Sequence, residues 1–377
     1  MVYLDYSATT PVAKEVLESF NKVCNDYIGN PNSLHRLGLN SKELMYEAIL
    51  QIASLLNVKQ QELIFTSGSS EANNLAIKGI CEKYQNRGKH IITTELEHAS
   101  VSEVFTYLKS KGFKVSYVKV LTDGTVNINH LKSILQDDTI LVSIGYVNSE
   151  LGILQPISDI GKLLKAYPKI FYHVDGTQAV GKIKVDLTDI DLFSFSAHKF
   201  YGLKGIGCLY KKDTIDIENI IHGGKSQTKY RGGTPALPLI VSMAKALRLA
   251  LEDLDEKYKH ILDLNIYLKN NLKNMEGVII NSNDKSIPHI LNISIPGIKP
   301  STMMNALSRH DIYISTQTAC SLADSPSTTL SALYHDNERA LSSLRISISH
   351  KTTKEEIDLF LKYFKEEYDK LKFMKEK

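Results

Sequence analysis

A lysine at the end of an apolar stretch gives the strongest chemical signal in the sequence. Residues 192–196 read as a buried strand, and His198 and Lys199 follow it directly, before a glycine-containing stretch at 202–207. Lysine amines form Schiff bases with aldehyde cofactors. A lysine after a strand is more often a solvated loop residue. The flanking serine and histidine favour a catalytic role for Lys199.

Two further strand ends carry groups that could bind a cofactor. Asp175 ends the stretch 173–175, where a carboxylate could pair with a protonated pyridine nitrogen or could equally cap a turn. Small residues at 67–70 follow the apolar residues 63–65 and precede a helix. The backbone amides of such a turn can bind a phosphate, although capping the helix is the commoner role of such turns.

Three single residues are further candidates. Cys320 lies in the polar stretch 315–321, and because cysteine is usually buried, it is a candidate nucleophile. His98 follows a strand and could stack on a flat cofactor, although a lone histidine is more often structural. Arg345 lies in an apolar alternating run, so it needs a carboxylate or phosphate partner, or forms a structural ion pair. The other cysteines look structural: Cys24, Cys81 and Cys208.

The elements that position these residues alternate between strands and helices. Apolar runs predict strands at 91–93, 140–147, 170–174, 192–196 and 206–210, and amphipathic stretches predict helices at 102–111 and 157–166. This alternation predicts an α/β domain with a mostly parallel sheet covered on both faces. Ligands then gather at the carboxyl ends of the strands.

The pattern changes near residue 253. Apolar residues at helical spacing predict a long helix through 261–272 and a last helix through 357–371, and residues 291–295 read as a strand. Thr353 and Glu356 form a capping box before the last helix. We therefore expect a large domain at 13–253 and a smaller α+β domain formed by residues 1–12 and 254–377.

Composition excludes several classes of protein. Four dispersed cysteines without a CxxC pair argue against a zinc site or a disulfide framework and fit a reducing cytoplasm. The formal charge of +3 gives no reason to expect direct nucleic-acid binding. The sequence shows neither a membrane-spanning tract nor a secretory signal.

Taken together and in order, these motifs resemble the cysteine desulfurases of the NifS/IscS type, a branch of the class V aminotransferases. The resemblance extends over nearly the whole chain through the stretches 3–11, 29–33, 67–74, 97–98, 147–152, 173–178, 196–199, 222–224, 231–234, 319–320 and 342–345. It implies the fold-type-I architecture of pyridoxal-phosphate enzymes, with a seven-stranded sheet in the large domain. It also implies a homodimer and no metal.

The resemblance assigns roles to matching positions. Lys199 would hold pyridoxal 5′-phosphate covalently and move the substrate Cα proton, and His98 would stack on the ring and assist proton transfer. Asp175 would pair with the pyridine nitrogen and Gln178 would bond the phenolic oxygen. The phosphate would be surrounded by Ser69, Ser70, Ser196, His198 and, from the second subunit, Thr234.

The resemblance also predicts the substrate and the reaction. Asn148 and Arg345 would hold the carboxylate of L-cysteine, and Cys320 would attack its sulfur to give L-alanine and a persulfide. A sulfur-acceptor protein, an iron–sulfur scaffold or a tRNA thiolase, would receive the sulfur. The chain departs from the usual pattern at Gln317, where glycine is common, and no glycine occurs after Gly297.

Two other functions compete with this interpretation. A lyase or aminotransferase of the same fold could act on another amino acid, and it would not require Cys320. A scaffold without catalytic activity could keep the fold and bind a partner, but it would not need Lys199, Asp175, Gln178 and His98 together.

Overall fold

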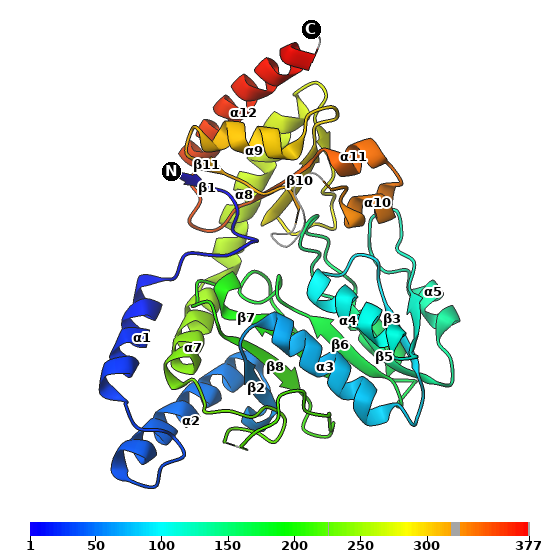
Figure 1. The fold of residues 1–377 in the computed structure, drawn as a ribbon. Coiled ribbons are helices and arrows are strands. Elements are labelled where there is room, and N and C mark those ends of the chain that lie inside the picture. Colours follow the sequence, from blue (N-terminus) through cyan, green and yellow to red (C-terminus); the bar gives the residue numbers. More distant parts are fainter. Residues whose placement is uncertain (225, 318–324, 376–377) are drawn as a thin grey trace.

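The computed structural model describes residues 1–224, 226–317 and 325–375, which form a larger region with a small α+β region above it (Figure 1). A seven-stranded sheet in the order β2-β8-β7-β6-β5-β3-β4 forms the centre of the larger region. Its strands are β2 Leu63–Thr66, β3 His90–Thr93, β4 Lys114–Tyr117, β5 Thr139–Gly145, β6 Phe171–Asp175, β7 Leu192–Ser196 and β8 Gly207–Lys211. The sheet is mostly parallel, because only β8 runs antiparallel to its neighbours β2 and β7.

Helices cover both faces of this sheet, as the alternating pattern predicts. Consecutive strand residues point to opposite faces, so Ile91 and Ile92 belong to different hydrophobic clusters. Ile91 packs in the cluster of α3 and α4, and Ile92 packs in the cluster of α1, α2, α6 and α7. The helices are α1 Lys14–Asp26, α2 Arg36–Leu56, α3 Ser69–Tyr84, α4 Ala99–Ser110, α5 Ile128–Ile134, α6 Ile157–Leu164 and α7 Leu237–Leu251, with short 3₁₀ turns η1 Gln60–Glu62 and η2 Ala197–Lys199.

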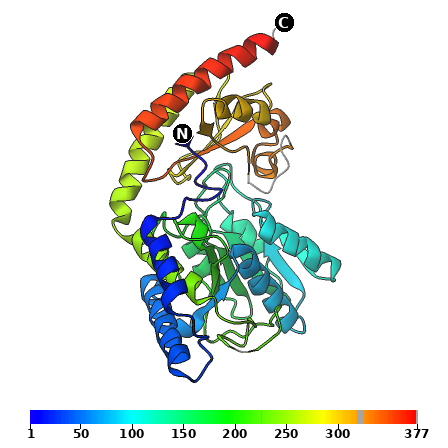
Figure 2. The same cartoon turned by 60° about the vertical axis from the view of Figure 1, so that its left-hand side comes forward.

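The smaller region contains both chain ends (Figure 2). A three-stranded antiparallel sheet has the order β12-β10-β9, and β1 pairs with β11 in parallel. These strands are β1 Val2–Tyr3, β9 Ile279–Ile280, β10 Ile290–Ser294, β11 Ile312–Tyr313 and β12 Ser343–Ser347. The helices are α8 Leu254–Lys273, α9 Pro300–Ser308, α10 Thr328–Tyr334, α11 Asn337–Leu341 and α12 Lys354–Lys375.

One hydrophobic cluster unites this smaller region. Val2 and Leu4 from the N-terminus pack there with the apolar faces of α8 and α12. The predicted capping box of α12 is confirmed: the Thr353 backbone N–H donates to Glu356 over 3.0 Å, and the Glu356 N–H donates to the Thr353 hydroxyl over 3.2 Å. The boundaries after residues 12 and 253 stay predictions. Over the described ranges, no helix is long and apolar enough to cross a bilayer.

Candidate active site

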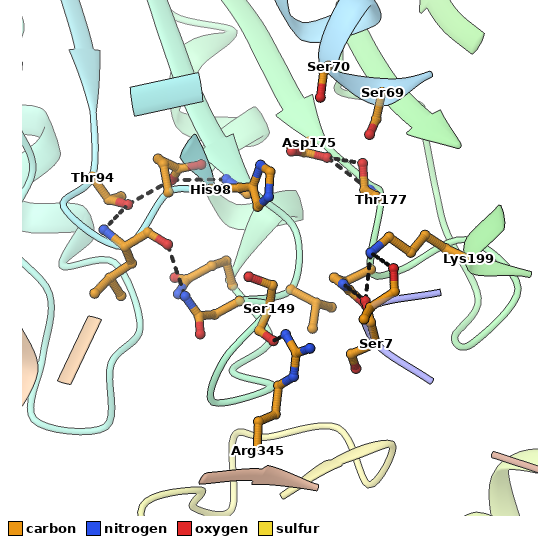
Figure 3. A pocket seen from close by; sticks show the side chains of 18 of the residues that line it. Ser7, Ser69, Ser70, Thr94, His98, Ser149, Asp175, Thr177, Lys199 and Arg345 are labelled. Atoms are coloured by element: carbon orange, nitrogen blue, oxygen red, sulfur yellow. Dashed lines mark hydrogen bonds between the residues drawn. The ribbon is translucent and has the colours of Figure 1, made fainter. Parts of the chain in front are cut away.

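A cavity of about 300 Å³ opens where β5, β6 and β7 end beneath the smaller region (Figure 3). Residues from seven separate stretches line it, and they include most of the predicted site: Ser69, Ser70, His98, Asn148, Asp175, Gln178, His198, Lys199 and Arg345. Two predicted residues lie outside the lining, because Ser196 is buried below it and Thr234 is exposed elsewhere on the chain. Cys320 lies outside the described residues.

Lys199 enters the cavity from the short turn after β7. Its Nζ donates hydrogen bonds to the carbonyl oxygens of Ser7, over 2.6 Å, and Ala8, over 2.9 Å. The same N-terminal segment is tied to the turn of Lys199, because the Thr10 N–H donates to the His198 carbonyl over 2.9 Å. The N-terminus therefore helps to position the lysine amine, which the sequence did not reveal.

Asp175 is the last residue of β6, and both of its carboxylate oxygens accept hydrogen bonds. Oδ2 accepts a hydrogen bond from the Asn73 amide over 2.9 Å, and Oδ1 accepts one from the Thr177 backbone N–H over 3.0 Å. The next residue must be glycine, since a Cβ on Gly176 would lie 1.9 Å from the Phe193 ring. Turn capping therefore uses Oδ1 of Asp175, and the pairing of Asp175 with a pyridine nitrogen stays a prediction.

The small-residue turn brings the start of α3 to the cavity. Ser69 and Ser70 are its first residues, and Gly68 before them provides no side-chain cap for the helix amides. Such amides with the helix dipole favour an anion. The Ser196 hydroxyl lies below the turn and donates to the Ile206 carbonyl over 3.3 Å. Its predicted contact with a phosphate stays a prediction.

His98 caps α4 at the side of the cavity opposite Lys199 (Figure 3). Its Nδ1 accepts a hydrogen bond from the Ser100 backbone N–H over 3.1 Å, which fixes the ring. Burial holds the pKa of His98 below its usual 6.5, so the imidazole is neutral at neutral pH. A neutral ring can stack on an aromatic ligand. Because Nδ1 accepts the Ser100 bond, the ring proton lies on Nε2, which is a donor.

Glu97 is a half-buried acid in the lining that the sequence reasoning did not single out. Its Oε1 accepts hydrogen bonds from the Thr94 hydroxyl over 2.7 Å and the Gly145 N–H over 3.1 Å. Burial raises the pKa of Glu97 to about 7. The sequence signal that could have identified Glu97 as a site residue is its position directly before His98.

Arg345 crosses from β12 into the roof of the cavity and is only 1% exposed. Its guanidinium donates to the Ser149 carbonyl and to Asp5 Oδ1, both over 3.0 Å. The predicted carboxylate partner is therefore Asp5, a residue that the sequence reasoning did not assign. Within the described residues, the buried Nε has no hydrogen-bond partner.

Asn148 and Gln178 are held by bonds to the protein. The Asn148 amide donates to the Leu96 carbonyl over 2.9 Å, and its oxygen accepts from the next turn of the chain. The Gln178 amide donates to the Ser7 carbonyl over 3.0 Å, and its oxygen accepts from Lys182. Burial lowers the pKa of Lys182 well below its ordinary range. Lys182 is a second amine of the site that was not predicted.

The three described cysteines differ in exposure. Cys81 in α3 and Cys208 in β8 are buried, and burial raises the pKa of both thiols. This agrees with the structural role expected of them. Cys24 differs, because it is exposed on α1. Its helical context did not show which face of the helix carried the thiol.

A mostly parallel sheet with a lysine and an acid at adjacent strand ends defines a fold-type-I enzyme of the pyridoxal-phosphate class. The chain belongs to the class-V aminotransferase family, whose model matches residues 2–360. It is 41% identical to "Cysteine desulfurase IscS" of Vibrio cholerae serotype O1, over 99% of this chain and 94% of that protein. It is 43% identical to the protein of the same name from Glaesserella parasuis serovar 5, over 98% and 93%.

Solved structures agree with this family. A protein named "NIFS-LIKE PROTEIN" matches with a TM-score of 0.92 and 37% identity, over 99% of both chains. The structure "SspA in complex with cysteine" matches with a TM-score of 0.82 and 32% identity, over 94% of this chain and 100% of the other. The predicted family and fold class are therefore confirmed.

Proposed function

We propose that this protein is a cysteine desulfurase that converts L-cysteine to L-alanine and keeps the sulfur as a persulfide on Cys320. One observation carries the proposal: the same cavity receives Lys199, Asp175 and the start of α3 from the sheet, and Arg345 from the smaller region. The first three suit an anionic aromatic aldehyde, and the arginine suits an amino-acid carboxylate. The relatives that are 41% and 43% identical to this chain are named for the same reaction.

The residues present fit pyridoxal 5′-phosphate as the cofactor. The cavity has the volume of a small-molecule site. Lys199 would hold the aldehyde carbon, and Asp175, already oriented by Asn73 and Thr177, would pair with the pyridine nitrogen. The serines at the start of α3 would bind the phosphate. When bound, this cofactor withdraws electrons from the substrate and allows the cysteine C–S bond to break heterolytically.

The chain's own residues then bind the substrate and move protons. Arg345 and Asn148 orient the carboxylate from the side of the smaller region. Lys199 takes the Cα proton, for which its place between the N-terminal carbonyls and the cavity is suitable. The neutral ring of His98 would stack on the cofactor and assist proton transfer through the proton on its Nε2.

Cys320 completes the reaction as the sulfur acceptor. Its thiolate attacks the substrate sulfur and forms an S–S bond as the C–S bond breaks, and the electron pair of the broken bond passes to the carbon skeleton. Two protons, one at Cβ and one at Cα, convert the skeleton to alanine. L-cysteine and the enzyme thiol thus give L-alanine and the enzyme persulfide without an external oxidant.

Assembly and sulfur delivery belong to the same proposal. The exposed Thr234 lies away from the cavity of its own chain, which is compatible with a contribution to the phosphate site of a second subunit in a homodimer. The persulfide sulfur passes to an iron–sulfur scaffold or a tRNA thiolase. A cytoplasmic location, expected from the cysteine pattern, stays a prediction.

The direct test is to incubate the purified holoenzyme with L-cysteine and measure alanine and enzyme-bound persulfide together. We expect one persulfide per alanine in the first turnover, with sulfide released only after a reducing thiol is added. Pyruvate and free sulfide in place of alanine would indicate a lyase, and no reaction after reconstitution with the cofactor would indicate a scaffold.

Arg345→Lys tests recognition of the carboxylate. Lysine keeps the positive charge but loses the planar fork, and it cannot bond both the Ser149 carbonyl and Asp5 while also reaching substrate. We expect KM for cysteine to rise about tenfold, since a charge-assisted hydrogen bond contributes about 1.5–3 kcal/mol, with cofactor content unchanged. An unchanged KM would assign Arg345 to the ion pair with Asp5 alone.

A further inference from the structure

The chain on both sides of the segment that carries Cys320 is hydrogen-bonded at or beside the residues assigned to the substrate carboxylate, Arg345 and Asn148. Before the segment, Ser315 and Arg345 pair through their backbones: the Ser315 N–H donates over 3.1 Å and the Arg345 N–H over 2.8 Å. After the segment, the Ser327 hydroxyl donates to Glu150 over 2.6 Å. Glu150 lies two residues after Asn148, in the loop whose Ser149 carbonyl binds Arg345.

Glu150 is a buried acid that the proposed reaction does not use. Its side chain lines no part of the cavity, and the residue is 4% exposed. Its described donors are two hydroxyls that follow the Cys320 segment, those of Ser327 and, over 3.4 Å, Thr329. A buried carboxylate is costly unless it is hydrogen-bonded, so its bonds to this part of the chain are structurally important.

Gln317 joins the two ends of the segment to each other. It is 5% exposed, and its amide Nε2 donates to the Ser325 carbonyl. This bond closes the base of the stretch 318–324. Cys320 lies three positions after Gln317 in the sequence. Gln317 is therefore the described residue nearest in sequence to the sulfur acceptor.

We infer that Glu150 and Gln317 are positioning residues, which hold the base of the Cys320 segment against the loop and strand that bind the substrate carboxylate. The inference rests on the proposed function. It joins the described residues on both sides of this segment to the carboxylate site through hydrogen bonds. Because a small misplacement of reacting groups costs a large factor in rate, we expect loss of either residue to slow the attack of the thiol on a cysteine held at Arg345 and Asn148.

The test compares four holoenzyme variants. Glu150→Ala removes the acceptor of Ser327, whereas Glu150→Gln keeps an oxygen at the same place. Gln317→Glu keeps the shape but loses the amide donor. Ser282→Ala is the matched control, because Ser282 is also buried and its hydroxyl donates to the same loop, at the Leu151 carbonyl over 2.9 Å, from outside the Cys320 segment.

Two measurements separate positioning from general damage. The change in cofactor absorption on titration with L-alanine reports amino-acid binding, and rapid alkylation reports persulfide formation at saturating cysteine. For Glu150→Ala and Gln317→Glu we expect persulfide formation to slow about tenfold or more, while alanine binding changes less than about twofold. Glu150→Gln should restore most of the rate, and Ser282→Ala should react like the wild type.

Each other outcome has a definite meaning. Wild-type rates in Glu150→Gln, Glu150→Ala and Gln317→Glu would overturn the inference. So would equal losses of alanine binding and persulfide formation, or an equal loss in Ser282→Ala, since these would show a structural role only. If the wild type itself forms no persulfide on Cys320, the proposed function fails, and that result is distinct from a failure of the positioning role.

Discussion

Replacing Lys199 with alanine is expected to abolish covalent attachment of the cofactor and to slow turnover at least about 10³-fold. Positioned proton transfer alone contributes on the order of 10²–10⁴-fold, and the variant also loses the group that holds the aldehyde. The variant loses the bonds of the amine to two carbonyls of the N-terminal segment. The fold should persist, because Thr10 still binds the turn after β7. Borohydride reduction followed by peptide mass analysis measures the attachment.

Lys182 provides the matched control for this experiment. It is a buried amine that bonds Gln178, which itself lines the cavity. Lys182→Met should still carry the reduced adduct on Lys199. An adduct found on Lys182, or a covalent adduct retained in Lys199→Ala, would contradict the assignment of Lys199.

Five strands of the large sheet could be predicted because each is a short apolar run between polar turns, whereas β4, with the sequence Lys-Val-Ser-Tyr, has no such run. The predicted strand at 192–196 coincides with β7, and the others differ from the observed bounds by at most two residues. Helix α4 begins at Ala99, three residues before the predicted start. His98 caps it with a ring nitrogen, and a histidine cap is not among the usual signals of a helix start.

The central site residues could be predicted for a topological reason. Parallel strands place their carboxyl ends at one edge of a sheet, so Lys199 and Asp175, which follow neighbouring strands, must lie near each other. Ser69 and Ser70 follow the carboxyl end of β2 and reach the same edge, because β2 and β7 are both antiparallel to β8 and therefore parallel to each other. The position of each motif directly after a strand was therefore sufficient to predict that its residues lie at this edge of the sheet.

The partners of these residues could not be predicted from the sequence alone. Asp5 and Arg345 are separated by 340 positions, and Asn73 and Asp175 by 102. Neither pair has a local pattern, because each forms only when separate elements pack together. Arg345 illustrates the consequence: an ion pair and a ligand-binding role were considered as alternatives, yet the guanidinium pairs with Asp5 and still lines the cavity.

Replacement of Cys320 by serine is expected to separate sulfur transfer from the remaining chemistry of the site. The variant should retain the cofactor and show the same change in absorption on binding cysteine, because Lys199, Asp175 and Arg345 are unchanged. Persulfide formation should be abolished, since a hydroxyl is a far poorer nucleophile toward sulfur than a thiolate. Alkylation after brief exposure to cysteine, with peptide mass analysis, measures the persulfide.

Cys24→Ser is the control for Cys320→Ser, because Cys24 is the exposed thiol among the described cysteines and can react with the same alkylating reagent. It should form the Cys320 persulfide at the wild-type rate. Since the chain after Gly297 lacks glycine, we expect the wild-type persulfide to release little sulfide until a reducing thiol or the acceptor protein is added. If Cys320→Ser converted cysteine to alanine at the wild-type rate, Cys320 would not be the sulfur acceptor, and a lyase would explain the site better.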